Sequence, residues 1–214
     1  MAETTVPYVV RAGDYLAKVA HLFGFDADTV WNLPENEELR TKRPNPNVLY
    51  PGDVLRIPKR EGEGVAVEGG TENTYAAPVP TSKISIVLYD PAGGLFASKR
   101  CIVRDIPNAP ESTTAEGKLE FDVPVTLRLV IVEFPDDEVI LELDVGGLDP
   151  GSEDSGVKHR LRNLGIYCDD GVESAENDER YANALRVFQQ RAGLPETGEL
   201  DDGTRAALLS EHLV

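Results

Sequence analysis

Two short apolar segments on either side of a helical pattern most constrain how the first sixty residues can fold. Residues 8–10 predict a strand that runs into a turn at Gly13, and residues 54–57 predict a short closing strand after a Pro-Gly turn. Between them, residues 16–23 place apolar side chains at the three- and four-residue spacing of a core-facing helix. Asp14 precedes that helix and is expected to cap it. Together these features predict a βααβ arrangement.

The same residues resemble a LysM module, a small domain whose family binds N-acetylglucosamine polymers such as peptidoglycan and chitin. The residues that match the family pattern are Tyr8, Val10, Gly13, Asp14, Leu16, Val19, Ala20, Phe23, Gly24, Asn47, Tyr50, Pro51, Gly52, Leu55, Ile57 and Pro58. The chain departs from the pattern at Tyr15, where the family usually has Thr or Ser, and at residues 31–34, where it has Leu-Asn-Pro. The connection over residues 35–47 is longer than usual. The resemblance implies a module over residues 1–59.

The resemblance also implies a glycan-binding site on two loops of this module. The residues to which it points are Gly13, Asp14, Tyr15, Leu16, Asn32, Asn36 and Tyr50. A sugar offers polar groups for hydrogen bonds and an apolar ring face for aromatic contact, which suits Tyr15 and Tyr50. Structural roles compete with this interpretation, since Asp14 is also a candidate helix cap and Trp31 a candidate core residue under the second helix.

The pattern changes after residue 59. Residues 60–82 are rich in Gly, Glu and Pro and lack periodicity, which predicts a solvated linker. Residues 83–150 predict a small antiparallel β-sandwich, because apolar segments alternate with turns. The predicted strands cover residues 84–90, 100–104, 118–123, 128–134 and 139–145. The turn sequences resemble those of immunoglobulin-like or transthyretin-like repeats that act as spacers in surface proteins.

Residues 151–214 return to helical spacing and predict a three-helix bundle. Asp201 or Asp202 is expected to cap the third helix. Three glycines stand where helices are expected to end: Gly165, Gly193 and Gly198. The bundle and the preceding parts make the predicted fold class α+β and multidomain.

Residues 156–212 resemble a peptidoglycan-binding domain that is often appended to hydrolases. The matching residues are Val157, Arg160, Leu161, Leu164, Gly165, Asp170, Gly171, Ala184, Leu185, Arg186, Phe188, Gln189, Gly193, Leu194, Thr197, Gly198, Leu200, Asp201, Thr204 and Leu208. An acidic loop is expected over residues 172–180, where the family has a shorter Gly-x-x-Thr turn. Phe188, Leu161 and Leu185 are expected in the core, with Leu164 beside them.

The charge of the chain limits its partners. The net charge of −17 argues against nucleic acid and against an anionic membrane surface. Residues 1–60 carry eight acidic and eight basic side chains, so the acidity belongs to the rest of the chain. We see no secretory signal at the N-terminus and no apolar stretch long enough to cross a membrane, which predicts a cytoplasmic protein. Delivery to the cell envelope by an injection system is the alternative.

No catalytic or metal-binding constellation stands out. His21, His159 and His212 lack zinc-site spacing, and the Gly-x-Ser-x-Gly motif is absent. Cys101 and Cys168 lie in different predicted domains, which favours two buried, reduced thiols over a disulfide or metal knuckle. A non-catalytic protein without a cofactor or metal is therefore expected.

Two functions follow from these patterns. The first is binding of peptidoglycan or another N-acetylglucosamine polymer by two modules joined through a β spacer, which raises affinity through effective concentration. The second is a structural or adaptor role in a contractile injection system, of the type VI secretion or phage-tail-like kind. LysM-like modules in such machines bind secretion-machine or baseplate proteins, and residues 31–36 resemble the form found there. An inert scaffold remains a third interpretation.

Overall fold

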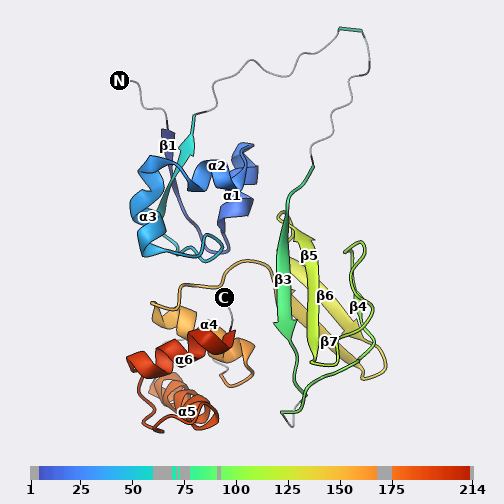
Figure 1. Cartoon of the computed structure of the whole chain (residues 1–214), viewed down its shortest axis with the longest axis vertical. Helices are drawn as coiled ribbons and strands as arrows, with labels where there is room; N and C mark the ends of the chain where they lie inside the picture. The colour runs from blue at the N-terminus through green and yellow to red at the C-terminus, as the bar shows by residue number, and fades with distance from the viewer. Residues whose placement is uncertain are drawn as a thin grey trace.

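The computed structural model describes residues 5–59, 69–70, 72, 78–90, 93–167 and 175–212, excepting the side chains of residues 175–177. Within these residues the protein is α+β, with six α-helices and antiparallel sheets (Figure 1). Most of the predicted linker, Cys168, and the pair Asp170 and Gly171 lie outside the described residues. No helix of the described part is both long enough and apolar enough to span a bilayer.

The N-terminal part is a two-stranded sheet covered by short helices. β1 (Thr5–Val9) pairs with β2 (Val54–Pro58) in antiparallel register. α1 (Leu16–Phe23) ends at Gly24, whose φ of 75° suits glycine.

The segment between α1 and β2 holds more helix than predicted. α2 (Ala27–Trp31) is followed by η1 (Pro34–Asn36) and α3 (Glu37–Lys42). The connection over residues 35–47, predicted as a long loop, therefore begins with a helical turn and a short helix.

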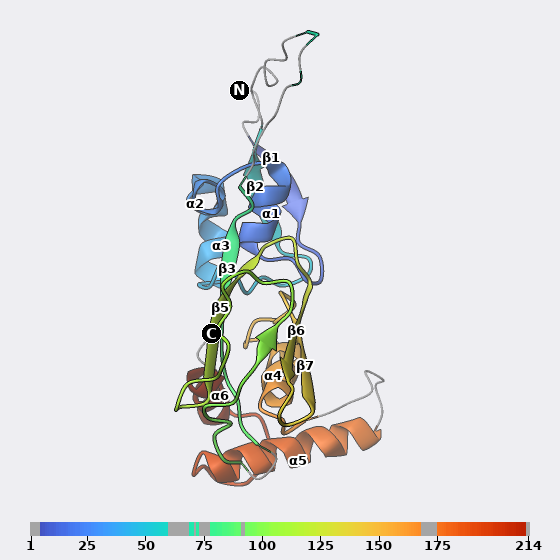
Figure 2. The same cartoon turned by 90° about the vertical axis from the view of Figure 1, so that its right-hand side faces the viewer.

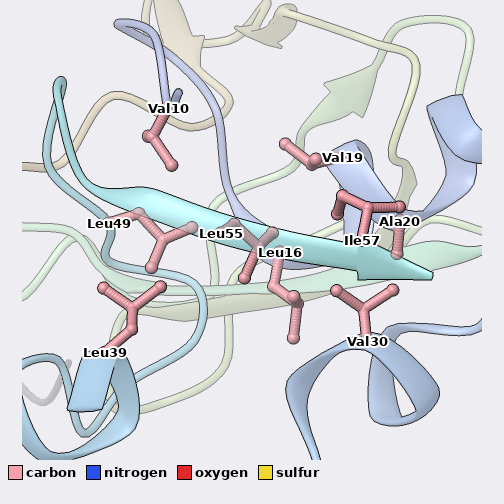
Figure 3. Packing of buried hydrophobic residues seen from close by; sticks show 9 residues of the cluster. All are labelled: Val10, Leu16, Val19, Ala20, Val30, Leu39, Leu49, Leu55 and Ile57. Atoms are coloured by element: carbon pink, nitrogen blue, oxygen red, sulfur yellow. The ribbon is translucent and has the colours of Figure 1, made fainter. Parts of the chain in front are cut away.

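One apolar core holds the N-terminal part together. Its buried residues come from both strands' ends and from three helices: Val10, Leu16, Val19, Ala20, Val30, Leu39, Leu49, Leu55 and Ile57. Their side chains gather around β2 (Figure 3). The helical spacing of residues 16–23 thus marked the buried face correctly. Trp31 packs partly buried against this cluster, as the structural alternative expected.

Five strands form two sheets in the central part. β3 (Thr81–Val87) pairs with β5 (Lys118–Pro124), and β6 (Leu129–Phe134) lies between β4 (Ile102–Val103) and β7 (Val139–Asp144). All pairs are antiparallel. The five predicted strands are confirmed, although β4 is shorter than expected and β3 begins at Thr81, inside the range expected for the linker.

The two sheets share one core and lie on opposite sides of it (Figure 2). Alternate residues of β5 and β6 point inward, including Leu119, Phe121, Val132 and Phe134. Cys101 is buried beside them, and burial raises the pKa of its thiol.

The C-terminal part contains α4 (Asp154–Asn163), α5 (Ala175–Arg191) and α6 (Asp202–His212). α5 begins at Ala175, so most of the acidic stretch over residues 172–180 is helix, and the prediction of a loop there is wrong. Asp201 caps α6, since its Oδ1 accepts a hydrogen bond from the Thr204 N–H at 2.6 Å.

These three helices enclose a third core. Its fully or nearly fully buried residues are Val157, Leu161, Tyr167, Ala184, Leu185, Phe188 and Leu208. Leu164 packs partly buried at its edge. The core positions predicted for Phe188, Leu161 and Leu185 are confirmed.

Candidate functional site

The connection between β1 and α1 is held by Asp14, although in a way that the sequence did not predict. Its carboxylate accepts hydrogen bonds from the Tyr8 hydroxyl at 2.7 Å and the Arg11 N–H at 3.0 Å, and lies 3.3 Å from Lys18 Nζ. Tyr15, with an extended backbone, stands at the N-cap of α1, and its side chain makes no capping hydrogen bond. The prediction of Asp14 as the helix cap is therefore wrong: its carboxylate closes the preceding turn instead.

These contacts set the ionisation of Asp14. Burial on its own raises the pKa of this carboxyl. The hydrogen bonds from Tyr8 and Arg11, with those from Lys18, outweigh burial, and the pKa falls below its usual value. The same contact and burial raise the pKa of Tyr8. Asp14 is thus an anchored carboxylate, half-buried at the surface.

Tyr15 and Leu16 point away from solvent. Each is 3% exposed. Leu16 belongs to the N-terminal core, whereas the Tyr15 hydroxyl donates to the Val125 carbonyl oxygen of the central part at 3.3 Å. Burial, opposed by a hydrogen bond involving Ser82, raises the pKa of Tyr15. Both side chains are buried in this structure, and their predicted contact with a glycan stays a prediction.

The glycine pair after β7 lets the two parts approach. Gly146 has a φ of 78°, and a Cβ on it would lie 2.9 Å from the Gly13 carbonyl oxygen and 2.9 Å from the Tyr15 ring. Figure 1 shows the connection from β7 to α4 passing beneath the N-terminal part. The β1–α1 loop, predicted to receive a sugar, is therefore packed against the protein's own backbone.

Of the remaining predicted residues, Asn36 has a structural role, whereas Asn32 and Tyr50 are at least partly exposed. Asn36 is fully buried, and its amide donates to the carbonyl oxygens of Val30 at 2.8 Å and Arg56 at 2.9 Å. Its Oδ1 accepts from the Arg56 N–H at 2.7 Å, so the side chain ties η1 to β2. Asn32, at the end of α2, is exposed. Tyr50 is half-buried, with the Arg43 guanidinium 5.5 Å from its ring centroid.

A buried ion cluster, which no local pattern indicated, joins the N-terminal part to the start of α4. Arg43 is 3% exposed, and its Nε lies 2.9 Å from Asp53 Oδ2 while its Nη1 lies 3.2 Å from Glu153 Oε1. Burial on its own raises the pKa of Asp53, but Arg43, the Tyr50 N–H and Lys42 together lower it below the usual value. Arg43 and Glu153 are 110 residues apart, so only the folded chain brings them together.

Gln189 organises the C-terminal part and explains its motif. The side chain is fully buried. Its Nε2, which has two hydrogens to donate, lies 3.0 Å from each of three acceptors, Thr197 Oγ1, the Glu199 carbonyl oxygen and Thr204 Oγ1. Its Oε1 accepts from the Gly198 N–H at 2.9 Å. Four positions that resemble the peptidoglycan-binding family therefore form one hydrogen-bonded network that holds the α5–α6 connection against α5: Gln189, Thr197, Gly198 and Thr204. Asp201 joins it through the Thr204 N–H, and Phe188 packs in the core.

A second buried cation supports the start of this part. Arg160 is 1% exposed, and its Nη1 donates to the carbonyl oxygens of Asp149 and Gly156, each at 2.8 Å. Burial lowers the pKa of Arg160, and Asp149 opposes this effect. Burial and the charge of Arg160 together lower the pKa of His212 at the end of α6. These groups fix the approach of the chain into α4.

An open cavity of about 490 Å³ lies where the three parts meet. The β1–α1 loop contributes Gly13, and the end of α4 contributes His159 and Arg162. The central part contributes Arg128, Asp144 and the glycine pair. Sequence reasoning missed this cavity because its walls come from segments more than one hundred residues apart.

Comparison with known proteins identifies one part of the chain. Residues 151–208 match the family described as "Putative peptidoglycan binding domain". No curated protein matches the chain, and no solved structure matches it. The C-terminal part of this protein is therefore a peptidoglycan-binding-like helical domain, as the resemblance over residues 156–212 predicted.

Proposed function

We propose that the protein is a non-catalytic peptidoglycan-binding protein whose C-terminal helical domain attaches it to the wall polymer. The match of residues 151–208 to a peptidoglycan-binding family carries this proposal. The Gln189 network supports it, because it assigns a folding role to the most characteristic motif residues and so accounts for their presence as a set.

The proposal extends to the other two parts. We infer a LysM-like module over residues 1–59, supported by a β1–β2 pair that encloses short helices around one core. We infer an immunoglobulin-like or transthyretin-like β-sandwich spacer over residues 83–150, supported by two antiparallel sheets that share a core. The helical domain follows over residues 151–214.

Glycan contact by the LysM-like module would fall to the residues that retain exposure. Asn32 is exposed, and Gly13, Asp14 and Tyr50 are half-buried, whereas Tyr15, Leu16 and Asn36 are buried. Asn32 carries both a donor and an acceptor, as recognition of an acetamide group requires. The module therefore offers a smaller site than the resemblance implied.

Sedimentation with insoluble peptidoglycan tests the function. The full chain is expected to pellet with the polymer and to stay in solution with cellulose, which has no acetamide groups. Asn32→Ala is expected to weaken pelleting with chitin, while Thr29→Ala, an exposed change on the same helix α2, leaves it unchanged. A chain that stays in solution with peptidoglycan would contradict the function. Equal chitin binding by both variants would contradict only the role of Asn32.

A second candidate is an adaptor role in a contractile injection system, with the LysM-like module binding protein. One observation favours it: the β1–α1 loop already packs against protein, through Tyr15 and Val125 and through Gly13 and Gly146. Copurification from a native lysate with tube, spike or baseplate proteins would support this role. A monodisperse protein without such partners, which still pellets with peptidoglycan, would leave wall binding as the function.

A further inference from the structure

The junction cavity combines cationic side chains with a carboxylate in one concave space. Arg128, Arg162 and His159 line it together with Asp144. The chain as a whole carries a net charge of −17, so two arginines around one cavity differ from its general acidic character. The volume of about 490 Å³ falls in the range of small-ligand sites, which often lie where domains meet.

Arg128 is positioned to bind an anion. Its Nη2 lies 3.6 Å from the position that a Cβ on Gly13 would occupy, which sets the guanidinium over the β1–α1 loop. The residue is exposed, and within the described part of the chain no carboxylate lies within ion-pair distance of its guanidinium. A guanidinium offers parallel N–H donors that match the two oxygens of a carboxylate.

The carboxylate of Asp144 adds a negative charge to the same cavity and so restricts which ligands fit it. Asp144 closes β7 and lines the same space, where its carboxylate can accept from an ammonium group. Gly147, which also lines the cavity, has a φ of 97° and no atom nearer than 4.0 Å to its missing Cβ, so no neighbouring group fills the space beside it. A ligand with a free carboxylate and a free amine can pair with the arginines through the first group and with Asp144 through the second.

We propose that the junction cavity binds a short peptide carrying a free carboxylate and a free amine, of the kind that branches from the glycan of peptidoglycan. The inference rests on the proposed function, because wall attachment by the C-terminal domain brings such peptides to the cavity. Arg128 and Arg162 bind the carboxylate, and Asp144 binds the amine. The helical domain and the junction thus recognise one polymer through separate contacts.

Calorimetry with a free wall tetrapeptide tests the inference on the full chain. The wild type is expected to bind the peptide, and raised salt is expected to weaken it. Arg128→Gln and Arg162→Gln are each expected to weaken binding about ten-fold. Asp144→Asn is expected to weaken binding of the tetrapeptide but not of a form whose side-chain amine is acetylated. Chitobiose, which lacks both charges, is expected not to respond to any of these changes.

Arg104→Gln is the matched control, since Arg104 is also exposed but pairs with Glu133 on the central sheet. This variant is expected to bind the tetrapeptide like the wild type. Failure of the wild type to bind the tetrapeptide would overturn the inference, as would wild-type affinity for the tetrapeptide in both Arg128→Gln and Arg162→Gln. Peptidoglycan sedimentation of the same proteins separates the two proposals: retention with the polymer keeps the proposed function even where the junction inference falls.

Discussion

The Tyr15 hydroxyl lies 3.3 Å from the carbonyl oxygen of Val125, although the two residues are 110 positions apart. The contact joins the β1–α1 loop to the turn after β5 and buries the tyrosine ring to 3% exposure. A side chain that the LysM resemblance assigned to a ligand thus serves the contact between two parts of the chain.

Truncation of Tyr15 is expected to destabilise the protein more than loss of its hydroxyl. Tyr15→Phe removes one hydrogen bond and should lower the free energy of unfolding by about 1 kcal/mol. Tyr15→Ala leaves a cavity and should lower it by about 3–5 kcal/mol. Chemical denaturation measures both. Tyr89→Ala is the control, because Tyr89 is 58% exposed and its loss should change stability by less than about 0.5 kcal/mol.

The adjacent glycines Gly146 and Gly147 offer a matched test of how closely the chain after β7 approaches the β1–α1 loop. Gly146 and Gly147 both have positive φ, so alanine at either position costs about 1–2 kcal/mol in backbone strain. Only Gly146→Ala would also push a methyl group against the Gly13 oxygen and the Tyr15 ring, adding roughly 1–3 kcal/mol. Hydrogen exchange of residues 10–16 should quicken in Gly146→Ala and not in Gly147→Ala. Equal effects would show that the approach is not tight.

The Gln189 network predicts a large loss from a change that preserves side-chain size. Gln189→Leu removes the hydrogen bonds of a fully buried amide, among them the one to the buried Thr204 hydroxyl, which is left without this partner. We expect a loss of about 3 kcal/mol or more in the free energy of unfolding. Gln190→Leu, next to it but exposed, should stay within about 0.5 kcal/mol of the wild type. A comparable loss in both variants would contradict the network's role.

Alanine in place of two helical glycines should change the free energy of unfolding in opposite directions. A Cβ on Gly156 would lie 2.0 Å from the Pro150 carbonyl oxygen, so Gly156→Ala should force the entry into α4 apart and lose about 3 kcal/mol. At Gly203, in the first turn of α6, the nearest atom is 3.5 Å away, and alanine should gain up to about 1 kcal/mol. Thermal unfolding of the two variants checks both signs. A loss of stability in Gly203→Ala would contradict the interpretation that a methyl group fits at position 203 without a clash.

The Arg43 cluster predicts sensitivity to acid. The pKa of Asp53 is lower in the folded chain than in the unfolded one, so its ionised form stabilises the fold above about pH 4. That stabilisation is lost as pH falls through the folded pKa, when the carboxylate takes up a proton. Asp14 acts with the same sign.

Arg43→Met should lower the free energy of unfolding by about 3 kcal/mol at pH 7, because it leaves the buried Asp53 with Lys42 as its one remaining cationic partner among the described residues. Since the pKa of Asp53 then rises, the variant's stability should fall less than that of the wild type between pH 5 and pH 3. Unfolding curves across this range measure the difference. Arg104→Met, which removes an exposed ion pair, should change stability by less than about 1 kcal/mol. Parallel pH profiles for Arg43→Met and wild type would contradict the linkage.

Local patterns predicted the elements of this protein well. The helical spacing of residues 16–23 identified α1, and the alternation of Leu119, Phe121 and Val123 identified the inward face of β5. These features depend on neighbours in sequence, since apolar period and burial are linked within one helix or strand. The capping role of Asp201 was predictable for the same reason.

Predictions about the candidate site were less successful because its contacts are distant in sequence. Asp14 could not be distinguished from a helix cap without knowing that the Tyr8 hydroxyl points at it. Asn36 looked suited to a sugar, yet Arg56 offers its own backbone as the partner. Likewise, nothing near Arg43 in the sequence indicates Glu153. Such pairings arise only when separately folded segments meet.

The Arg43–Glu153 contact has a mechanical consequence. It connects the N-terminal module to the entrance of α4 directly, beside the covalent route through the linker and the central strands. Under the proposed function, a pull on the polymer bound by the C-terminal domain would reach the N-terminal part through this side-chain link and through Tyr15. An ion pair and a single hydrogen bond are expected to separate at a lower load than an apolar core, which is held by many packing contacts. The junction is therefore the first place where the protein would lengthen under load, with its three cores still folded.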